Sequence, residues 1–186
     1  KKHEVGSQVQ LPNGSLMTLI QKGLPQLVRV DSQLTEQDFE KMGELPLPPY
    51  IQKARKERHN IKEDQSWYQT AWAEKAGSFA APTASLHFTD HDLELLKNKG
   101  VQVLKITLHV GLGTFLPVKV QDLNDHQMHA EVYSVDSMVW DQIQKTKKNG
   151  KFVWALGTTV TRTLETVART GQLSGESKLM LQQGSE

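Results

Sequence analysis

The sequence contains no cysteine among its 186 residues. This absence excludes a disulfide framework, a zinc site with thiolate ligands and a catalytic thiol. Long hydrophobic runs are also missing, since no stretch approaches the roughly 18 apolar residues that a membrane-spanning helix needs. The first residues, Lys1-Lys-His-Glu4, lack the apolar core of a signal peptide. We therefore expect a soluble, cytoplasmic protein that does not associate with membranes.

Neither sign of charge dominates the chain. Lysine and arginine number 22 against 21 aspartate and glutamate, which leaves a net charge of +1. This balance neither favours nor opposes binding to nucleic acid, so any basic surface has to be local. Hydrophobic residues make up 37% and charged residues 23%, a composition typical of a globular protein. The length suits one domain, or a domain with part of another.

Two short runs hold an unusual mixture of residues, namely 78–88 and 107–115. Both place histidine, threonine, glycine or proline next to apolar residues, which packing alone does not require. Small residues let the backbone approach a ligand, and histidine titrates near neutral pH. These runs are the first candidates for a functional site.

The first forty residues predict a small β unit. Asn13-Gly14 lies between the apolar runs Val9–Leu11 and Leu16–Ile20, which is a strong hairpin signal, and Leu27–Val30 reads as a third strand. Thr35 with Asp38 predicts a capped helix that ends near Gly43.

The next segments are expected to be irregular. Leu45-Pro-Leu-Pro-Pro-Tyr-Ile51 is typical of an extended, polyproline-like path, either as a rigid linker or as part of a functional element. Residues 53–64 are strongly charged and predict a solvated loop. We also expect the polar tail after Gln172 to be disordered or cut short.

From residue 65 onward the pattern alternates between helix and strand. The expected elements are a helix over 65–75, a helix from Thr89 to Gly100, a strand over 101–110, a helix from Ser134 to Asn149, a strand over 151–156 and a helix from Thr159 to Gly171. The helix after Ser134 is expected to share one apolar face among Val135, Met138, Val139 and Ile143. Strands separated by helices of this length indicate parallel βα units.

The strand over 101–110 becomes polar toward its carboxyl end. Lys105, Thr107 and His109 fall on one face, because strand residues alternate sides. In parallel α/β folds the carboxyl ends of strands hold the ligand site. Structural and catalytic roles for His109 both remain open. Gly111-Leu-Gly113 is not a dinucleotide fingerprint, since the third glycine is absent and Pro117 interrupts the following segment.

Two further patterns each allow two interpretations. Gly157-Thr-Thr159 with Arg162 is either an ordinary helix start or a site for an anion at a helix N-terminus. His126, His129 and Glu131 offer three metal ligands, but their spacing matches no common zinc pattern. We favour a hydrogen-bonded His129–Glu131 pair over a metal site.

Several ordered blocks together resemble one known family. The blocks are Leu45-Pro-Leu-Pro-Pro-Tyr-Ile51, Tyr68-Gln-Thr70, Glu74-Lys75, Ala80-Ala-Pro-Thr-Ala84 with Leu86-His-Phe88, Thr107-Leu-His-Val-Gly111 with Gly113-Thr-Phe115, Met128-His129 with Glu131, and Gly157-Thr-Thr159 with Arg162 and Leu164-Glu165. They resemble the S-adenosylmethionine:tRNA ribosyltransferase-isomerases of queuosine biosynthesis. Family members usually carry glycine where Ser85 stands and serine where Ala130 stands.

The resemblance covers nearly the whole chain but only about half of a family member. The family's amino-terminal segment, with its Asn-Asn-Thr-Arg signature, has no counterpart here. Its carboxyl-terminal third, with an Asn-Phe-His-Leu-Pro signature, has none either. We therefore expect a central portion of the family's polypeptide.

The resemblance implies an α/β fold. It predicts part of a β/α barrel-like catalytic domain over residues 44–186, preceded over residues 1–43 by the end of a small β-barrel-like domain. It also implies a transferase and isomerase reaction, in which the ribosyl part of S-adenosylmethionine is added to 7-aminomethyl-7-deazaguanine in the anticodon loop of tRNA. The product is epoxyqueuosine, and adenine and methionine are released. S-adenosylmethionine is then a consumed co-substrate, no metal is expected, and we expect a monomer.

The implied reaction assigns roles to the candidate residues. The sulfonium acidifies the adjacent ribose carbon, so a base near neutral pKa is needed: His109 is the first candidate and His129 the second. Glu131 would orient His129 or accept a proton, and Thr107 or His87 would donate to the departing adenine.

The remaining candidates bind the two substrates. The expected substrate-binding residues are Pro82, Thr83, His87, Gly111, Gly113, Thr114, Gly157, Thr158, Thr159 and Arg162. The group around Gly157 and Arg162 would hold the methionine carboxylate or a tRNA phosphate. Candidate stacking platforms for a tRNA base are Tyr50, Trp67, Tyr68 and Phe115, although core packing is favoured for Trp67 and Trp72.

Two other functions remain as alternatives. One is a metal-dependent hydrolase that uses His126, His129 and Glu131. The other is a non-catalytic RNA-binding module, in which the βα core is only a scaffold.

Overall fold

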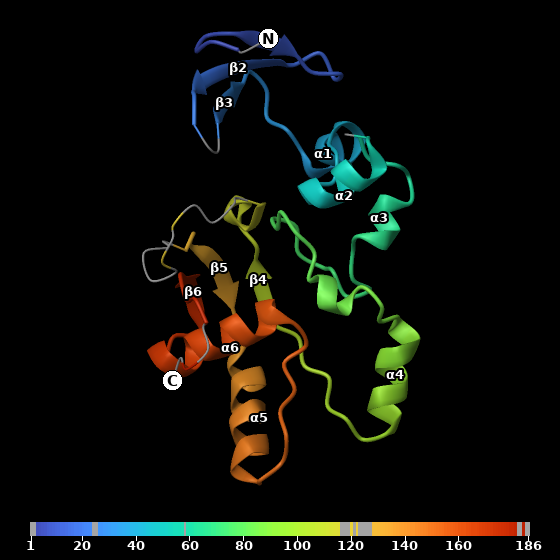
Figure 1. Cartoon of the computed structure of the whole chain (residues 1–186), viewed down its shortest axis with the longest axis vertical. Coiled ribbons are helices and arrows are strands. Elements are labelled where there is room, and N and C mark those ends of the chain that lie inside the picture. Colours follow the sequence, from blue (N-terminus) through green and yellow to red (C-terminus); the bar gives the residue numbers. More distant parts are fainter. Residues whose placement is uncertain are drawn as a thin grey trace. The chain divides into compact units, whose positions relative to one another are not determined.

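A computed structural model describes residues 3–23, 26–57, 59–115, 120, 122, 128–181 and 184. The chain forms two compact units, Lys1–Leu45 and Pro46–Glu186. Both contain strands and helices, so the fold is mixed α/β, and each unit has one three-stranded sheet (Figure 1). None of the helices in the described ranges has both the length and the apolar character needed to cross a bilayer.

The sheet of the first unit consists of β1 (Gln8–Gln10), β2 (Leu16–Gln21) and β3 (Leu27–Val30), in that order. Both pairings are antiparallel, with Val9 opposite Met17 and Met17 opposite Val30. The predicted turn joins β1 to β2: Gly14 adopts φ +90°, and the Asn13 side chain accepts a hydrogen bond from the Ser15 N–H at 3.0 Å. The predicted hairpin and third strand are confirmed.

The first unit ends with the helix α1 (Glu36–Met42), which starts as the sequence predicts. The Thr35 hydroxyl accepts from the Asp38 N–H, and the Asp38 carboxylate accepts from the Thr35 N–H at 2.9 Å. The hydrogen bond from the Thr35 backbone lowers the pKa of Asp38, and the Thr35 hydroxyl adds to this effect. This reciprocal capping fixes where the helix begins.

The proline-rich segment is helical in its second half, which corrects the expectation of an extended path up to Ile51. Helix α2 (Pro49–Arg55) has proline in its first turn, where the missing N–H costs nothing. Leu47, just before it, is only 5% exposed. The segment therefore packs into the second unit.

The charged stretch after α2 is not simply a solvated loop, because Asp64 is buried. Its carboxylate accepts from the Arg55 guanidinium at 2.8 Å and from the Ile61 N–H at 2.9 Å. Asp64 begins α3 (Asp64–Trp67), which is much shorter than the helix expected over 65–75. Core packing was favoured for two tryptophans, which differ: Trp67 is 60% exposed, which corrects that expectation, whereas Trp72 packs edge-on against Phe88.

Helix α4 (Asp90–Asn98) follows the short 3-10 turn η1 (Thr83–Ser85). Thr89 caps α4 through a reciprocal pair with Asp92, and the chain leaves the helix at Lys99 and Gly100 as predicted. The hydrogen bond from the Thr89 hydroxyl lowers the pKa of Asp92, and the Thr89 backbone N–H adds to this effect.

The second sheet has the order β4 (Thr107–His109), β5 (Glu131–Ser134) and β6 (Ser174–Ser177). Both of its pairings are antiparallel, so the expectation of parallel βα units is wrong for these strands. Residues 101–106 and 151–156, which were expected to be strand, have no regular structure, and β6 lies in the tail that was expected to be disordered. The sheet therefore takes its third strand from a polar segment.

Helices α5 (Ser137–Lys148) and α6 (Thr158–Thr170) complete the second unit (Figure 1). Asp136 caps α5 instead of the predicted Ser134, because Ser134 is used in the sheet, opposite Thr107 and Ser174. Helix α6 ends at Gly171 in the left-handed conformation, as predicted.

The core of the second unit lies between one face of the sheet and the two helices. Its buried members are Tyr133, Val135 and Val167, and Leu108 and Val139 pack against them. Of the face predicted for α5, Ile143 is buried as well, but Met138 is 76% exposed, which corrects its assignment.

Candidate functional site

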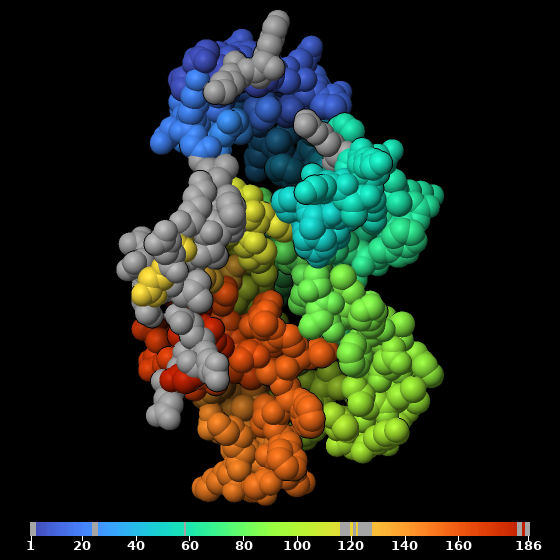
Figure 2. Space-filling model, in the orientation of Figure 1, coloured from blue at the N-terminus to red at the C-terminus, as the bar shows by residue number. Residues whose placement is uncertain are grey.

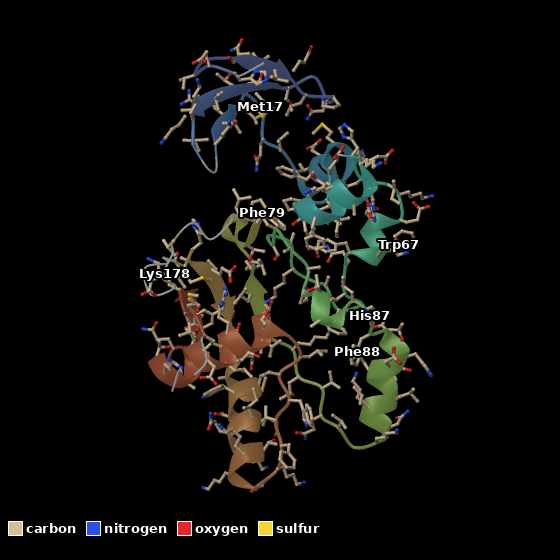
Figure 3. The ribbon with its side chains drawn as sticks, viewed as in Figure 1. Met17, Trp67, Phe79, His87, Phe88 and Lys178 are labelled. Atoms are coloured by element: carbon tan, nitrogen blue, oxygen red, sulfur yellow. The ribbon has the colours of Figure 1, made fainter. Side chains whose placement is uncertain are left out.

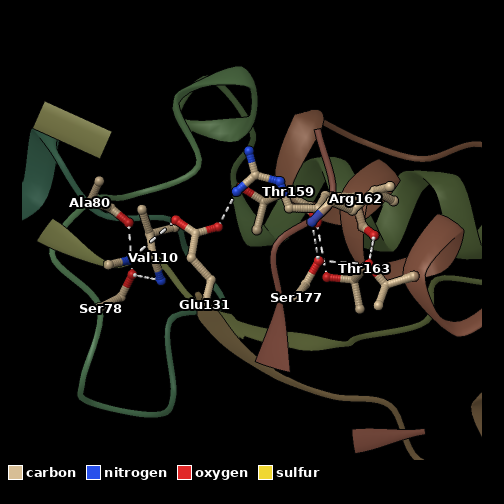
Figure 4. A network of polar contacts seen from close by, with 11 residues as sticks. Ser78, Ala80, Val110, Glu131, Thr159, Arg162, Thr163 and Ser177 are labelled. Atoms are coloured by element: carbon tan, nitrogen blue, oxygen red, sulfur yellow. Dashed lines mark hydrogen bonds and ion pairs between the residues drawn. The ribbon is translucent and has the colours of Figure 1, made fainter. Parts of the chain in front are cut away.

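A buried carboxylate joins three separate segments of the second unit. Glu131, at the start of β5, is 5% exposed and forms an ion pair with Arg162 in the first turns of α6 (Figure 4). Its other oxygen accepts the Gly111 N–H at 3.2 Å. One side chain thus ties the loop after β4 to the sheet and to α6. The pair also explains a basic residue near a helix N-terminus, since Glu131 supplies the negative charge.

A second set of hydrogen bonds holds residues 78–80 at the end of β4. The Phe79 N–H donates to the Val110 carbonyl at 2.9 Å, and the Val110 N–H donates to the Ser78 hydroxyl at 3.0 Å. The Ser78 hydroxyl in turn donates to the Ala80 carbonyl at 3.0 Å (Figure 4). The two unusual runs of the sequence therefore meet at Val110. Sequence reasoning gave Ser78 no role, although its place in the first run was a signal.

The strand register separates the candidate residues onto two faces of the sheet. His109 lies opposite Val132, which is 52% exposed, and Thr107 lies opposite Ser134. Leu108 and Tyr133 point to the other face, toward the core. Glu131 lies two residues before Tyr133 in β5 and therefore points to the same face as Tyr133. His109 and Thr107 thus share the outer face, whereas Glu131 belongs to the core face.

His109 is half-buried against the segment before Ser78. A Cβ built on Gly77 would lie 3.1 Å from the His109 Nδ1, and Gly77 itself adopts φ +122°. The imidazole therefore packs on a glycine that no other residue replaces without strain. This close approach positions the His109 ring.

The expected pair of His129 and Glu131 does not form among the described residues. The Glu131 carboxylate binds Arg162 and Gly111 instead. The His129 ring lies directly over Gly113: a Cβ added there would be 2.2 Å from the His129 Cδ2. Gly113 and the exposed Thr114 belong to the 3-10 turn η2 (Leu112–Phe115). Gly113 is therefore required by the close approach of an imidazole.

The start of α6 has the geometry of a glycine turn. Gly157 is the N-cap, with φ +92°, and no side chain caps the first N–H groups. Thr158 and Thr159 follow at once. A Cβ added to Gly157 would lie 3.3 Å from the Ala84 side chain, so the turn approaches η1 closely. The structure thus brings the turn near the candidate residues Pro82 and Thr83, which flank and begin η1.

Farther along α6, hydroxyls serve the fold. The Thr163 hydroxyl donates to the Thr159 carbonyl, and the Thr166 hydroxyl donates to the Arg162 carbonyl. Ser177 of β6 contacts the Thr166 hydroxyl at 2.7 Å, and both side chains are buried. Since a hydroxyl has one proton, Ser177 donates to Thr166. These bonds fix α6 on the sheet.

His87 lies apart from His109 in the sequence and lines two shallow depressions of the second unit. One, of about 340 Å³, lies beside α4 with Phe88 and Leu95, and the other, of about 290 Å³, lies beside α2 with Tyr50 and Trp67. Figure 3 shows Trp67, His87 and Phe88 in the same part of the molecule. The exposed His87 is thus a surface residue, and the exposed rings of Tyr50 and Trp67 line the same depression.

The described residues contain no cluster of three His, Cys, Asp or Glu side chains that would hold a metal. His126, one of the three candidate metal ligands, lies outside the described residues. The ion pair with Arg162 also makes the Glu131 carboxylate a poor metal ligand.

Comparison with known proteins finds relatives that match most of this chain. A family model described as "Queuosine biosynthesis protein" matches residues 1–186. A protein of Sulfurihydrogenibium sp. (strain YO3AOP1) is 46% identical over 155 residues, which are 83% of this chain and 45% of the relative. A protein of Staphylococcus aureus (strain JH9) is 44% identical over 173 residues, or 91% of this chain and 49% of the relative.

Both relatives are named S-adenosylmethionine:tRNA ribosyltransferase-isomerase. The chain spans about half the length of these curated relatives. The match of the family model to the full length nevertheless decides the family. This chain belongs to the queuosine biosynthesis protein family.

Proposed function

We propose that this chain supplies part of the catalytic centre of an S-adenosylmethionine:tRNA ribosyltransferase-isomerase. The reaction would transfer and isomerise the ribosyl group of S-adenosylmethionine onto 7-aminomethyl-7-deazaguanine in tRNA, giving epoxyqueuosine, adenine and methionine. The observation that carries the proposal is the contact of Glu131 with both Arg162 and Gly111, which assembles three of the family-like blocks into one site. The names of the two relatives support the same reaction.

In this proposal residues 44–186 form part of a β/α barrel-like catalytic domain, and residues 1–43 are the end of a small β-barrel-like domain. The packing of α5 and α6 beside one sheet supports the first part. The three-stranded meander of β1, β2 and β3 supports the second. Because the proposed substrate is tRNA, we place the enzyme in the cytoplasm. We also propose that it is a monomer.

His109 is the proposed base. The sulfonium of the co-substrate acidifies the adjacent ribose carbon, and a nearby imidazole would take that proton. The ring of His109 is held by Gly77 on the outer face of the sheet, which Thr107 shares. Thr107 would then donate a hydrogen bond to the departing adenine. His129, held over Gly113, is the second candidate base.

Glu131 is proposed as a positioning residue and not as the base. Its carboxylate holds the Arg162 guanidinium, whose side chain keeps 24% of its surface exposed. A guanidinium has five N–H donors, so one ion pair leaves capacity for an anionic group. The uncapped N–H groups at Thr158 and Thr159 add donors nearby. Together they would bind the methionine carboxylate or a tRNA phosphate.

The tRNA base is proposed to be read near α2. Tyr50 is 65% exposed and Trp67 is 60% exposed, and both line the depression of about 290 Å³ beside His87. Exposed aromatic rings are suitable platforms for an unstacked base. Tyr68 is buried, which raises the pKa of its hydroxyl, so it belongs to the packing instead.

The test uses the Staphylococcus aureus relative with its matched region replaced by this chain. The chimera is incubated with S-adenosylmethionine and precursor tRNA, and adenine release is measured. We expect His109→Ala to lower the rate by at least about 100-fold, with His91→Ala, an exposed histidine of α4, as the matched control.

Three outcomes count against the proposal. A folded chimera that releases no adenine, beside an active parent enzyme, contradicts the proposed reaction. Full activity of both His109→Ala and His129→Ala contradicts the assignment of the base. Release of adenine that depends on an added divalent metal favours the alternative of a metal-dependent enzyme.

A further inference from the structure

The segment 151–156 exposes side chains that proteins normally bury. It connects α5 to α6, and its sequence Lys151-Phe-Val-Trp-Ala-Leu156 has a single charge. Phe152 is 88% exposed and Trp154 is 90% exposed. Figure 2 shows α5 and the segment after it (orange) at the surface. Large aromatic side chains contribute most when buried, so this segment is a candidate for an interface.

Among the described residues, the backbone of 152–156 also has no backbone hydrogen-bonding partner. Lys151 donates its N–H to the Thr146 carbonyl, and the Gly157 carbonyl accepts from the Thr161 N–H. Between these two anchors, the backbone of 152–156 makes no hydrogen bond to another backbone group of the described residues. Its composition is that of a strand buried on both faces. A strand with free N–H and C=O groups and apolar side chains is a template for pairing with another strand.

The apolar exposure continues onto neighbouring elements. The Gln142 side chain of α5 donates to the Gln102 side chain at 2.6 Å, so residues near 102 lie beside this helix. Val101 and Leu104 are 48% and 41% exposed, and Met138, one turn before Gln142, is 76% exposed. Residues four apart share a side of a helix. Two further parts of the second unit, the first turn of α5 and the residues near 102, therefore also expose apolar side chains.

The comparison with relatives indicates what covers this region. The matches include 83% and 91% of this chain, but only 45% and 49% of the two relatives. Each relative thus has about as much polypeptide again outside the match. That amount is sufficient for several strands and helices, which average about six and twelve residues.

We propose that residues 152–156 are a docking strand for the part of the family's polypeptide that lies outside the matched region. That part would pair with the backbone of 152–156 and cover Phe152 and Trp154 with apolar side chains. The segment leads directly into the Gly157 turn, so its docking would also fix the start of α6 and hence Arg162. The inference rests on family membership and does not require the proposed reaction.

Hydrogen exchange tests this proposal. Exchange of the amides of 152–156 is measured in the isolated chain and in the chimera with the Staphylococcus aureus relative. We expect these amides to exchange at least about 100-fold more slowly in the chimera, because paired strand amides are protected. Trp154→Asp in the chimera is expected to remove that protection. Phe39→Asp is the matched control, since Phe39 is a similarly exposed ring on α1, at 61%.

Every other result overturns the proposal. Fast exchange of 152–156 in the folded chimera means that the rest of the polypeptide does not cover the segment. Slow exchange in the isolated chain at low concentration means that the segment is already paired within the chain. Exchange that slows with concentration, together with a dimer in sedimentation, assigns the surface to a second copy. If the chimera does not fold, the same measurement on the aligned residues of the unaltered relative decides between these results.

Discussion

Glu131 shows how the contacts of a single side chain hold separate segments of the site together. It is an acid on the core face of a sheet, where an unpaired charge would be costly. Arg162 supplies the opposite charge and the Gly111 N–H a further hydrogen bond, so the carboxylate is satisfied. The two partners differ in one respect: the Arg162 side chain is 24% exposed and reaches water, whereas Glu131 is 5% exposed.

This difference predicts an asymmetric pair of substitutions. Arg162→Met leaves Glu131 charged and without its cation in the interior, and should cost about 3–5 kcal/mol of unfolding free energy. Glu131→Gln leaves an arginine that still reaches water, and should cost about 2 kcal/mol. The double variant should cost less than the sum by at least about 1 kcal/mol. Urea unfolding of the four proteins measures all three values, and additive costs would contradict a direct interaction.

Gly113 and Gly111 make a second, matched test at the residue scale. A Cβ at Gly113 would lie 2.2 Å from the His129 Cδ2 and 2.7 Å from its Cβ, so Gly113→Ala must displace His129. A Cβ at Gly111 would lie 3.6 Å or more from its neighbours, which is ordinary contact. We expect Gly113→Ala to cost about 1–3 kcal/mol and to shift the His129 ring resonances in NMR spectra. Gly111→Ala should change stability by less than about 0.5 kcal/mol. Equal effects of the two substitutions would refute this packing.

At the scale of elements, an ion pair defines the connection between α2 and α3. The Arg55 side chain, from the last turn of α2, binds Asp64 at the start of α3, and the Ile61 N–H joins from the intervening loop. Burial by itself raises the pKa of Asp64. The hydrogen bonds from Arg55 and Ile61, with the charge of Arg55, outweigh burial and hold the pKa below its ordinary value of 3.8.

The direction of this shift predicts the pH dependence of stability. Because the folded pKa lies below the unfolded one, the ionised carboxylate stabilises the fold above about pH 4. That contribution is lost as the pH falls through the folded pKa. Asp64→Asn should therefore lower the thermal midpoint at pH 7, and the gap to the wild type should narrow as the pH falls below about 4 and through the folded pKa. Glu63→Gln, an exposed neighbour, should change stability by less than about 0.5 kcal/mol. A gap that stays constant from pH 7 to the onset of acid unfolding would exclude this linkage.

The sequence predicted the elements that local chemistry defines. Thr35 and Thr89 cap helices through reciprocal side-chain bonds, Asn13-Gly14 turns the hairpin, and Gly171 ends α6. Each of these signals acts within a few residues and needs no tertiary partner. That is why they could be recognised from the sequence alone.

Elements that depend on distant partners were predicted less well. Residues 151–156 have the composition of a strand but lack a partner among the described residues, whereas the polar segment Ser174–Ser177 pairs with β5. Pairing decides strand formation more than composition does. The same applies to the site. Histidines and glycines marked the two runs, but the pairing of Glu131 with Arg162 across 31 positions has no local signal.

At the scale of the whole molecule, the two units differ in the size of their cores. In the described part of Lys1–Leu45, Leu19 is the only large hydrophobic side chain that is buried. The second unit buries Tyr133, Val135, Ile143 and Val167, among others. A three-stranded meander with one buried anchor is at the lower limit of independent stability.

Native-state hydrogen exchange should therefore show two levels of stability within one chain. We expect the amides of β2 to exchange at least tenfold faster than those of β5, which corresponds to about 1.4 kcal/mol or more of local free energy. Leu19→Ala should accelerate exchange in β1, β2 and β3 while leaving β5 unchanged. Val167→Ala, at a side chain that is 1% exposed, should lower the protection of β5 by at least about 2 kcal/mol. If all six strands instead exchanged with a single free energy that both substitutions lowered equally, the chain would unfold as one cooperative unit, and the small core around Leu19 would not limit its stability.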